Sequence, residues 1–174
     1  MCSADLHEKV DPRMRVRPNP KEVERAAEML VEAKLPLLIV GDELYKTNSA
    51  EKAVKLAELL GMPVTQNRQV FANFPEAHPL WVGGRALGTQ SPDVVINVGN
   101  KMMHGGNPAP LVPRHFKFID MWIDSASMGN VITTDVPLVA DGGYGLDDLI
   151  VAIEGIMTAT IKKQAQERDA NGRA

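Results

Sequence analysis

The stretch that decides the fold class is residues 92–99, which read PDVVINVG. A short apolar run ends there in Gly99, and both of its faces are apolar, as a buried parallel strand requires. Toward the N-terminus, residues 37–41 read LLIVG and repeat the pattern. The two stretches predict two buried strands that each end in a glycine.

Around these strands the sequence alternates between helical and extended patterns. A helix is predicted to begin at Asn19-Pro20, because Asn19 can cap it, Pro20 suits its first position and Glu22 completes a capping box. A second helix follows Ser49 and ends at Gly61, where a C′ glycine belongs. Further predictions are short strands at 63–65, 116–123 and 136–139, and a last helix from 145 to about 163. Strands that alternate with helices predict βαβ units and a parallel sheet.

Length and composition are those of an ordinary single-domain protein. The chain has 174 residues, a net charge of -3 and one cysteine, Cys2. Its basic residues are scattered, which disfavours a nucleic-acid partner, and no apolar run has the length of a membrane span. With no signal-peptide pattern and no internal disulfide, we expect a cytoplasmic protein. We divide it into a linker or arm (1–18), an α/β domain (19–160) and a frayed tail (161–174).

The carboxyl ends of the strands are where parallel α/β sheets bind ligands. Gly41 and Gly99 would let a ligand approach the backbone closely. An acidic side chain there could accept a hydrogen bond from a ribose hydroxyl, and Arg68 or Lys101 could bind a phosphate. The alternative is structural: the two glycines make turns, and Asp124 caps a short helix at 125–129. The candidate nucleotide-binding residues are Gly41, Asp42, Asn67, Arg68, Gly99, Asn100, Lys101 and Asp124.

Other kinds of chemistry have little support. The turn at 141–145 precedes a helix, as phosphate loops do, but its DGGYG sequence matches neither G-x-G-x-x-G nor a Walker loop. Asp147 and Asp148 would also repel phosphate, and they favour the helix dipole instead. The four histidines lack metal-ligand spacing, no G-x-S-x-G elbow is present, and nothing near Cys2 would activate its thiol. We therefore predict no catalytic residue and no metal ligand.

Several segments follow one another in a familiar order. They are 33–41 (AKLPLLIVG), 50–64 (AEKAVKLAELLGMPV), 73–80 (NFPEAHPL), 92–99 (PDVVINVG), 118–129 and 135–141 (DVPLVAD). No single motif is specific, but the ordered set, which covers about residues 20–155, resembles the central domain of thiamine-diphosphate-dependent enzymes of the acetolactate synthase family.

The resemblance implies a Rossmann-like three-layer domain with a parallel sheet of about six strands, of the DHS-like NAD/FAD-binding type. In the family, this domain lies between two domains that bind thiamine diphosphate and Mg²⁺. The implied partners are therefore flanking domains or separate subunits, and a homo-oligomer is expected. Some members bind FAD or ADP, but this chain carries Asn100-Lys101-Met102 where those members have an R-F-D signature. The family's aspartate position also holds Trp122, with Asp120 two residues earlier.

The function implied by the resemblance is that of a structural central domain of an acetolactate-synthase-like enzyme, not catalytic by itself and with nucleotide binding left open. Two alternatives remain. One is a stand-alone accessory subunit, such as the ε subunit of the CO dehydrogenase/acetyl-CoA decarbonylase-synthase complex. The other is an independent protein that binds FAD, ADP or NAD.

Overall fold

The centre of the molecule is a five-stranded parallel sheet with the strand order β2-β1-β3-β4-β5. It is seen in a computed structural model that describes residues 16–66, 70–83, 91–101 and 116–172. The strands are β1 (Pro36–Val40), β2 (Val64–Gln66), β3 (Val94–Val98), β4 (Lys117–Trp122) and β5 (Val136–Val139). The helices are α1 (Pro20–Glu32), α2 (Glu43–Lys46), α3 (Ala50–Leu60), the 3-10 turn η2 (Ser125–Ser127), α4 (Gly142–Ile156) and α5 (Ala159–Gly172). The predicted parallel α/β fold is confirmed, with five strands in the described residues where we expected about six.

The two stretches that predicted buried strands are neighbours in the sheet. β1 and β3 pair in parallel over their full lengths, and Val40 pairs with Val98 at their last position. All residues of both strands are buried. Their carboxyl ends therefore stop at the same level, which brings Gly41 beside Gly99.

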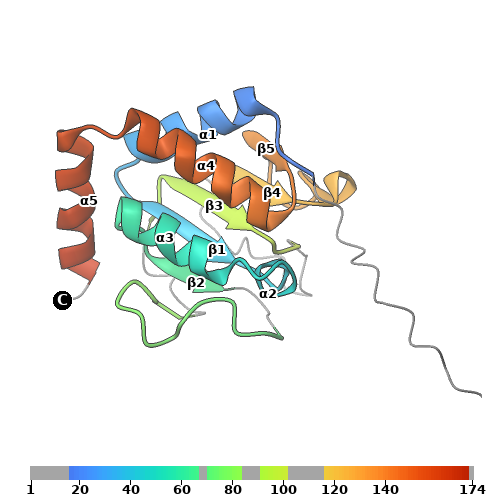
Figure 1. Cartoon of the computed structure of the whole chain (residues 1–174), viewed down its shortest axis with the longest axis horizontal. Helices are drawn as coiled ribbons and strands as arrows, with labels where there is room; N and C mark the ends of the chain where they lie inside the picture. Colours follow the sequence, from blue (N-terminus) through green and yellow to red (C-terminus); the bar gives the residue numbers. More distant parts are fainter. Residues whose placement is uncertain (1–15, 67–69, 84–90, 102–115, 173–174) are drawn as a thin grey trace, which may run out of the picture.

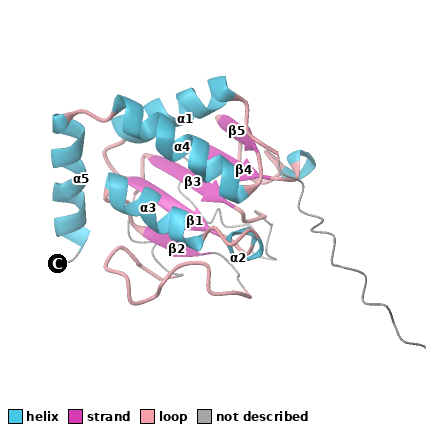
Figure 2. Cartoon of the chain, viewed as in Figure 1, coloured by secondary structure: helices cyan, strands magenta, loops and turns pink. Residues whose placement is uncertain are grey.

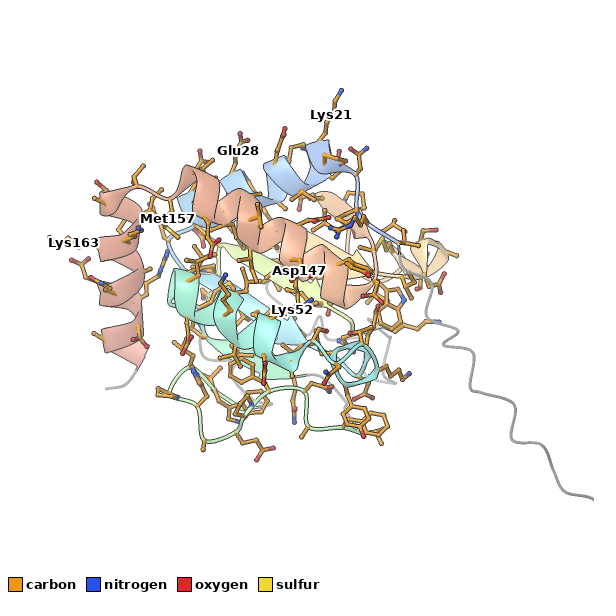
Figure 3. The ribbon with its side chains drawn as sticks, in the orientation of Figure 1. Lys21, Glu28, Lys52, Asp147, Met157 and Lys163 are labelled. Atoms are coloured by element: carbon orange, nitrogen blue, oxygen red, sulfur yellow. The ribbon has the colours of Figure 1, made fainter. Side chains whose placement is uncertain are left out.

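One face of the sheet is covered by a layer of helices. α1, α4 and α3 lie side by side over it (Figure 1), and the strands run beneath them (Figure 2). The core between the layers contains alternate strand residues and the apolar faces of the helices, among them Leu30, Leu38, Val40, Leu56, Ile96, Met121 and Leu149. Each fully buried side chain of this kind stabilises the fold by roughly 1.5–3 kcal/mol. The outer face of α1 is polar, and Figure 3 shows Lys21 and Glu28 pointing away from the sheet.

The other face of the sheet carries a smaller apolar cluster. Leu37, Ile39, Val95 and Phe118 are buried there, with Phe116, Val131 and Ile132 packed against them. On the first face, α3 and α4 belong to the layer of helices, and α5 packs on α3. The helices α1, α3 and α4 thus lie on the same side of the sheet.

The ends of the helices follow the predicted signals in most places. The side chain of Asn19 accepts a hydrogen bond from the backbone of Lys21 and caps α1. Gly61 ends α3 in the left-handed conformation, with φ of 59°. Ser49 precedes α3 as predicted, but its side chain makes no capping bond and lies against Thr47 instead.

The C-terminal region differs from the expectation of one helix to about 163 and a frayed tail at 161–174. α4 ends at Ile156, and α5 turns away after Met157 and packs on α3 (Figure 3). A Cβ added at Gly61 would lie 2.1 Å from the Ala165 carbonyl oxygen, so glycine permits this contact. Arg168 Nη1 donates to the Ala33 carbonyl oxygen at 2.7 Å and fixes the far end of α5. These long-range contacts stabilise a helix whose own sequence has no strong apolar face.

The end of the predicted arm is also fixed to the domain. Arg17 forms an ion pair with Asp148 and lies over the ring of Tyr144 at 4.7 Å. The backbone of Asp141 donates to the Val16 carbonyl oxygen at 3.0 Å.

Among the described residues, every helix is too short or too polar to cross a lipid bilayer.

Candidate functional site at the carboxyl rim of the sheet

The tips of β1 and β3 pack directly against each other. A Cβ on Gly41 would lie 2.2 Å from the Gly99 carbonyl oxygen, and one on Gly99, whose φ is +67°, would lie 2.7 Å from the Glu43 Cβ. The Glu43 backbone N–H also donates to the Gly99 carbonyl oxygen at 3.1 Å. The space that these glycines leave free is therefore filled by the chain's own backbone.

Asp42 holds the loop that begins at residue 70. Its carboxylate accepts hydrogen bonds from the backbone N–H groups of Val70 and Phe71 and from Asn73 Nδ2, at 3.0 to 3.2 Å. Burial acts to raise the pKa of Asp42, but these three donors and the nearby charge of Lys46 outweigh it, so the pKa is lowered. Asp42 therefore stays ionised and acts as a fixed acceptor within the chain.

Glu43 is a buried carboxyl group between the tip of β1 and the start of α4. Only 7% of the residue is exposed. Its Oε1 accepts the Gly142 backbone N–H at 3.1 Å, whereas its Oε2 is buried without a hydrogen-bond partner. Burial raises the pKa of Glu43 to about 7, and the carboxylate of Asp141 adds to the rise, while the Gly142 N–H, Lys46 and the Ile123 backbone oppose it. This group changes charge close to neutral pH.

The glycine-rich turn before α4 is satisfied by carboxylates of the same chain. Asp141 accepts hydrogen bonds from the backbone N–H groups of Gly143 and Tyr144, and Glu43 accepts the one from Gly142. Phosphate loops offer such N–H groups to a ligand. Here they are already paired with the carboxyl groups of Asp141 and Glu43, so these N–H groups are not free to bind a phosphate.

A pair of polar side chains lies inside the sheet below the rim. Asn97 and Asp120 occupy paired positions of β3 and β4, and Asn97 Nδ2 donates to Asp120 Oδ1 at 2.8 Å and to the Asn100 carbonyl oxygen at 2.7 Å. Asn97 Oδ1 is buried without a partner. Burial raises the pKa of Asp120, and the bond from Asn97 partly offsets the rise. The pair joins two central strands by a side-chain bond.

The remaining predicted site residues are placed as follows. Asp124 caps η2, since its carboxylate accepts the Ala126 backbone N–H at 3.0 Å and the Ser127 hydroxyl at 3.0 Å. Lys101 is exposed just beyond Asn100. Asn67 and Arg68 lie outside the described residues. The structure thus brings Gly41, Gly99 and Asn100 together, and a role for any of the eight residues in nucleotide binding stays a prediction.

The predicted site residues did not include Glu43, Asn97 or Asp120, although Glu43 follows Asp42 at the tip of the first predicted strand. A signal exists for the last two, because each is the polar residue of an otherwise apolar strand, VVINV and FIDMW. No local signal exists for Glu43, whose burial depends on α4, almost a hundred residues further along the chain. Within the described ranges, no three His, Cys, Asp or Glu side chains are grouped as a metal site would require.

The ordered strands, the glycine tips and the loop motif together match a known family. A family model described as "Thiamine pyrophosphate enzyme, central domain" matches residues 23–149. The chain belongs to this family. The resemblance inferred from the motifs is thereby confirmed.

Individual relatives support the same assignment. The chain is similar to the acetolactate synthase large subunit of Corynebacterium glutamicum, with 31% identity over 134 residues, which cover 71% of this chain and 21% of the relative. It is also similar to the sulfoacetaldehyde acetyltransferase of Castellaniella defragrans, with 28% identity over 163 residues, 84% of this chain and 26% of the relative. A solved structure from Mycobacterium smegmatis, described as a thiamin diphosphate-dependent enzyme, has a TM-score of 0.72 and 26% identity, and covers 81% of this chain and 29% of that one. The chain therefore spans about a quarter of the length of these relatives.

Proposed function

We propose that this chain is a structural central domain of an acetolactate-synthase-like enzyme and that it is not catalytic by itself. In such an enzyme, the ylid of thiamine diphosphate would add to the carbonyl group of the substrate. One observation carries the proposal. The acidic side chains that the sheet presents at its carboxyl rim, Asp42, Glu43 and Asp141, all accept hydrogen bonds from backbone N–H groups of this same chain.

The described residues do not fit thiamine diphosphate or its Mg²⁺ ion. A diphosphate needs free N–H groups or basic side chains, whereas the N–H groups at the start of α4 are paired with Asp141 and Glu43. Mg²⁺ needs several oxygen ligands, and the described part of the chain has no group of three acidic or histidine side chains. We therefore assign the cofactor and the reaction to the partners, which are flanking domains or separate subunits in a cytoplasmic oligomer.

The proposal is tested by measuring activity and binding for the chain alone and for the chain coexpressed with thiamine-diphosphate-binding segments. Alone, with pyruvate, thiamine diphosphate and Mg²⁺, it should release no CO₂, and the cofactor should not raise its melting temperature, because a ligand that binds the folded state must do so. Coexpressed with any thiamine-diphosphate-binding segments found in its own reading frame or in neighbouring genes, it should copurify with them. Turnover by the chain alone, or a cofactor-dependent rise in its melting temperature, would contradict a purely structural role.

The same thermal measurement addresses nucleotide binding at the predicted residues. FAD, ADP, NAD and CoA are added separately, since any tight ligand of the rim must stabilise the folded chain. A shift with FAD or ADP alone would support the nucleotide prediction for residues such as Gly99, Asn100 and Lys101. If the chain binds a nucleotide but none of the thiamine-diphosphate-binding segments, the result would support the alternative that it is an independent nucleotide-binding protein.

A further inference from the structure

Three exposed apolar side chains lie on two segments beyond the tip of β1: Tyr45 belongs to α2 (Figure 1), and Val70 and Phe71 lie in the loop that Asp42 holds. Val70 is 82% exposed, Tyr45 59% and Phe71 38%. The rings of Tyr45 and Phe71 stack in parallel, with centroids 4.4 Å apart and an interplanar angle of 8°. We call Tyr45, Val70 and Phe71 the aromatic patch. Single exposed apolar residues are ordinary on protein surfaces, but a cluster that includes two large rings indicates a contact surface.

A network of polar groups holds the aromatic patch in a fixed shape. Asn73 is fully buried; its Oδ1 accepts the Tyr45 backbone N–H at 3.2 Å, and its Nδ2 donates to the Phe71 carbonyl oxygen at 2.9 Å and to Asp42 Oδ1 at 3.0 Å. Asp42 in turn accepts the backbone N–H groups of Val70 and Phe71. Both ring-bearing segments are thus tied to one amide and one carboxylate. A surface ordered in this way loses little conformational freedom when a partner binds.

We propose that the aromatic patch is the surface on which this chain docks a thiamine-diphosphate-binding domain or subunit. This inference rests on the proposed function, and two observations favour this occupant. The chain spans 21% to 26% of the relatives' length, so most of the protein mass that such an enzyme needs lies outside it. The patch also offers an area only on the order of 300 Å², whereas a stable interface needs roughly 800 Å² on each partner. That area is too small to hold two copies of this chain together by itself, but it suits one contact among several in a multidomain enzyme.

The test replaces the patch and leaves its polar support intact. In the variant Tyr45→Ser/Val70→Ser/Phe71→Ser, Asp42 and Asn73 keep the backbone contacts that they make. The matched control is Val151→Ser/Ile156→Ser, which removes the exposed apolar residues of α4, 67% and 41% exposed. Calorimetry compares both variants with the wild type for binding to the thiamine-diphosphate-binding segments with which the chain copurifies. Far-ultraviolet circular dichroism and the melting temperature confirm that each variant is folded.

We expect the patch variant to bind at least about tenfold more weakly, because buried aromatic residues dominate interface energies, and the control to remain within about twofold of the wild type. Unchanged binding by the folded patch variant would overturn the inference while leaving the proposed function intact. Failure of the wild type to bind would contradict the proposed function, and the inference with it. A dimer of the wild type that the patch variant loses in light scattering, with partner binding unchanged, would show that a second copy is the occupant.

Discussion

Replacement of Glu43 by glutamine should make the protein more stable at pH 8 but not at pH 4.5. The wild-type carboxyl group is buried, and one oxygen has no hydrogen-bond partner, so the folded state favours its neutral form. Glutamine has nearly the same shape, can still accept the Gly142 N–H through its side-chain oxygen, and carries no charge. The substitution therefore removes the charge and leaves the contact.

The magnitude and the sign follow from linkage between protonation and folding. Burial raises the pKa of Glu43 from 4.5 to about 7, which corresponds to about 3 kcal/mol at roughly 1.4 kcal/mol per pKa unit. Because the folded pKa is the higher one, the cost is absent below pH 4.5, grows as pH rises toward 7, and is fully present above 7. About 3 kcal/mol is an upper bound, and for a chain of 174 residues it corresponds to a rise in melting temperature of roughly 6–12 °C.

The assay is urea denaturation of the wild type and of Glu43→Gln at pH 4.5, 6, 7 and 8. The difference in the free energy of unfolding should grow with pH and level off above about 7. The control is Glu51→Gln, which removes an exposed carboxylate of α3 and should show no such growth. A stability difference that is the same at pH 4.5 and pH 8, or a glutamine variant that is less stable at pH 8, would refute the reasoning.

Five further substitutions, in three comparisons, test the packing. Gly41→Ala should lower the free energy of unfolding by about 3 kcal/mol in urea denaturation, because its Cβ would lie 2.2 Å from a carbonyl oxygen. The control Gly155→Ala, in open space on α4, should be neutral or stabilising. Equal effects of the two substitutions would contradict this packing. At pH 8, Asp120→Asn should be at least as stable as the wild type, because it removes a buried charge and keeps an acceptor for Asn97. Asn97→Leu should cost about 2–4 kcal/mol, because it leaves the Asp120 carboxylate without its donor, and the opposite order of stability would show that Asp120 carries no buried charge. Arg168→Ala should release α5 and speed proteolysis between α4 and α5, and an unchanged cleavage rate would show that the bond to the Ala33 carbonyl is not its anchor.

The fold could be read from the sequence because its signals are local. Doubly apolar runs such as 94–98 specify buried parallel strands, and Asn19 and Gly61 mark helix ends through bonds within a few residues. The C-terminal helix could not be read in this way. α5 depends on the contact between Gly61 and Ala165 and on a bond from Arg168 to a carbonyl more than a hundred residues away. Composition alone therefore predicted fraying there.

The candidate site was predictable in position but not in detail. The rule that ligands bind at the carboxyl ends of strands led to Gly41, Asp42 and Gly99, and the register of β1 and β3 does place their tips together. Which groups are buried, and what they bond to, depends on chain segments that meet only in the folded protein. Glu43 shows this, since nothing near it in sequence indicates that α4 will cover it and raise its pKa.

The hydrogen bonding of the rim supports the proposal that the chemistry belongs to other domains or subunits. A residue that transfers a proton must come within hydrogen-bond reach of the substrate, so its side chain cannot be fully occupied by bonds within the fold. Asp42 is held by backbone N–H groups with a lowered pKa, and Asp124 is held as a cap. Glu43 titrates near neutral pH, but its carboxyl group faces the buried start of α4 and not the solvent. These groups are fixed by the fold that they stabilise, which is what the proposed structural role requires of them.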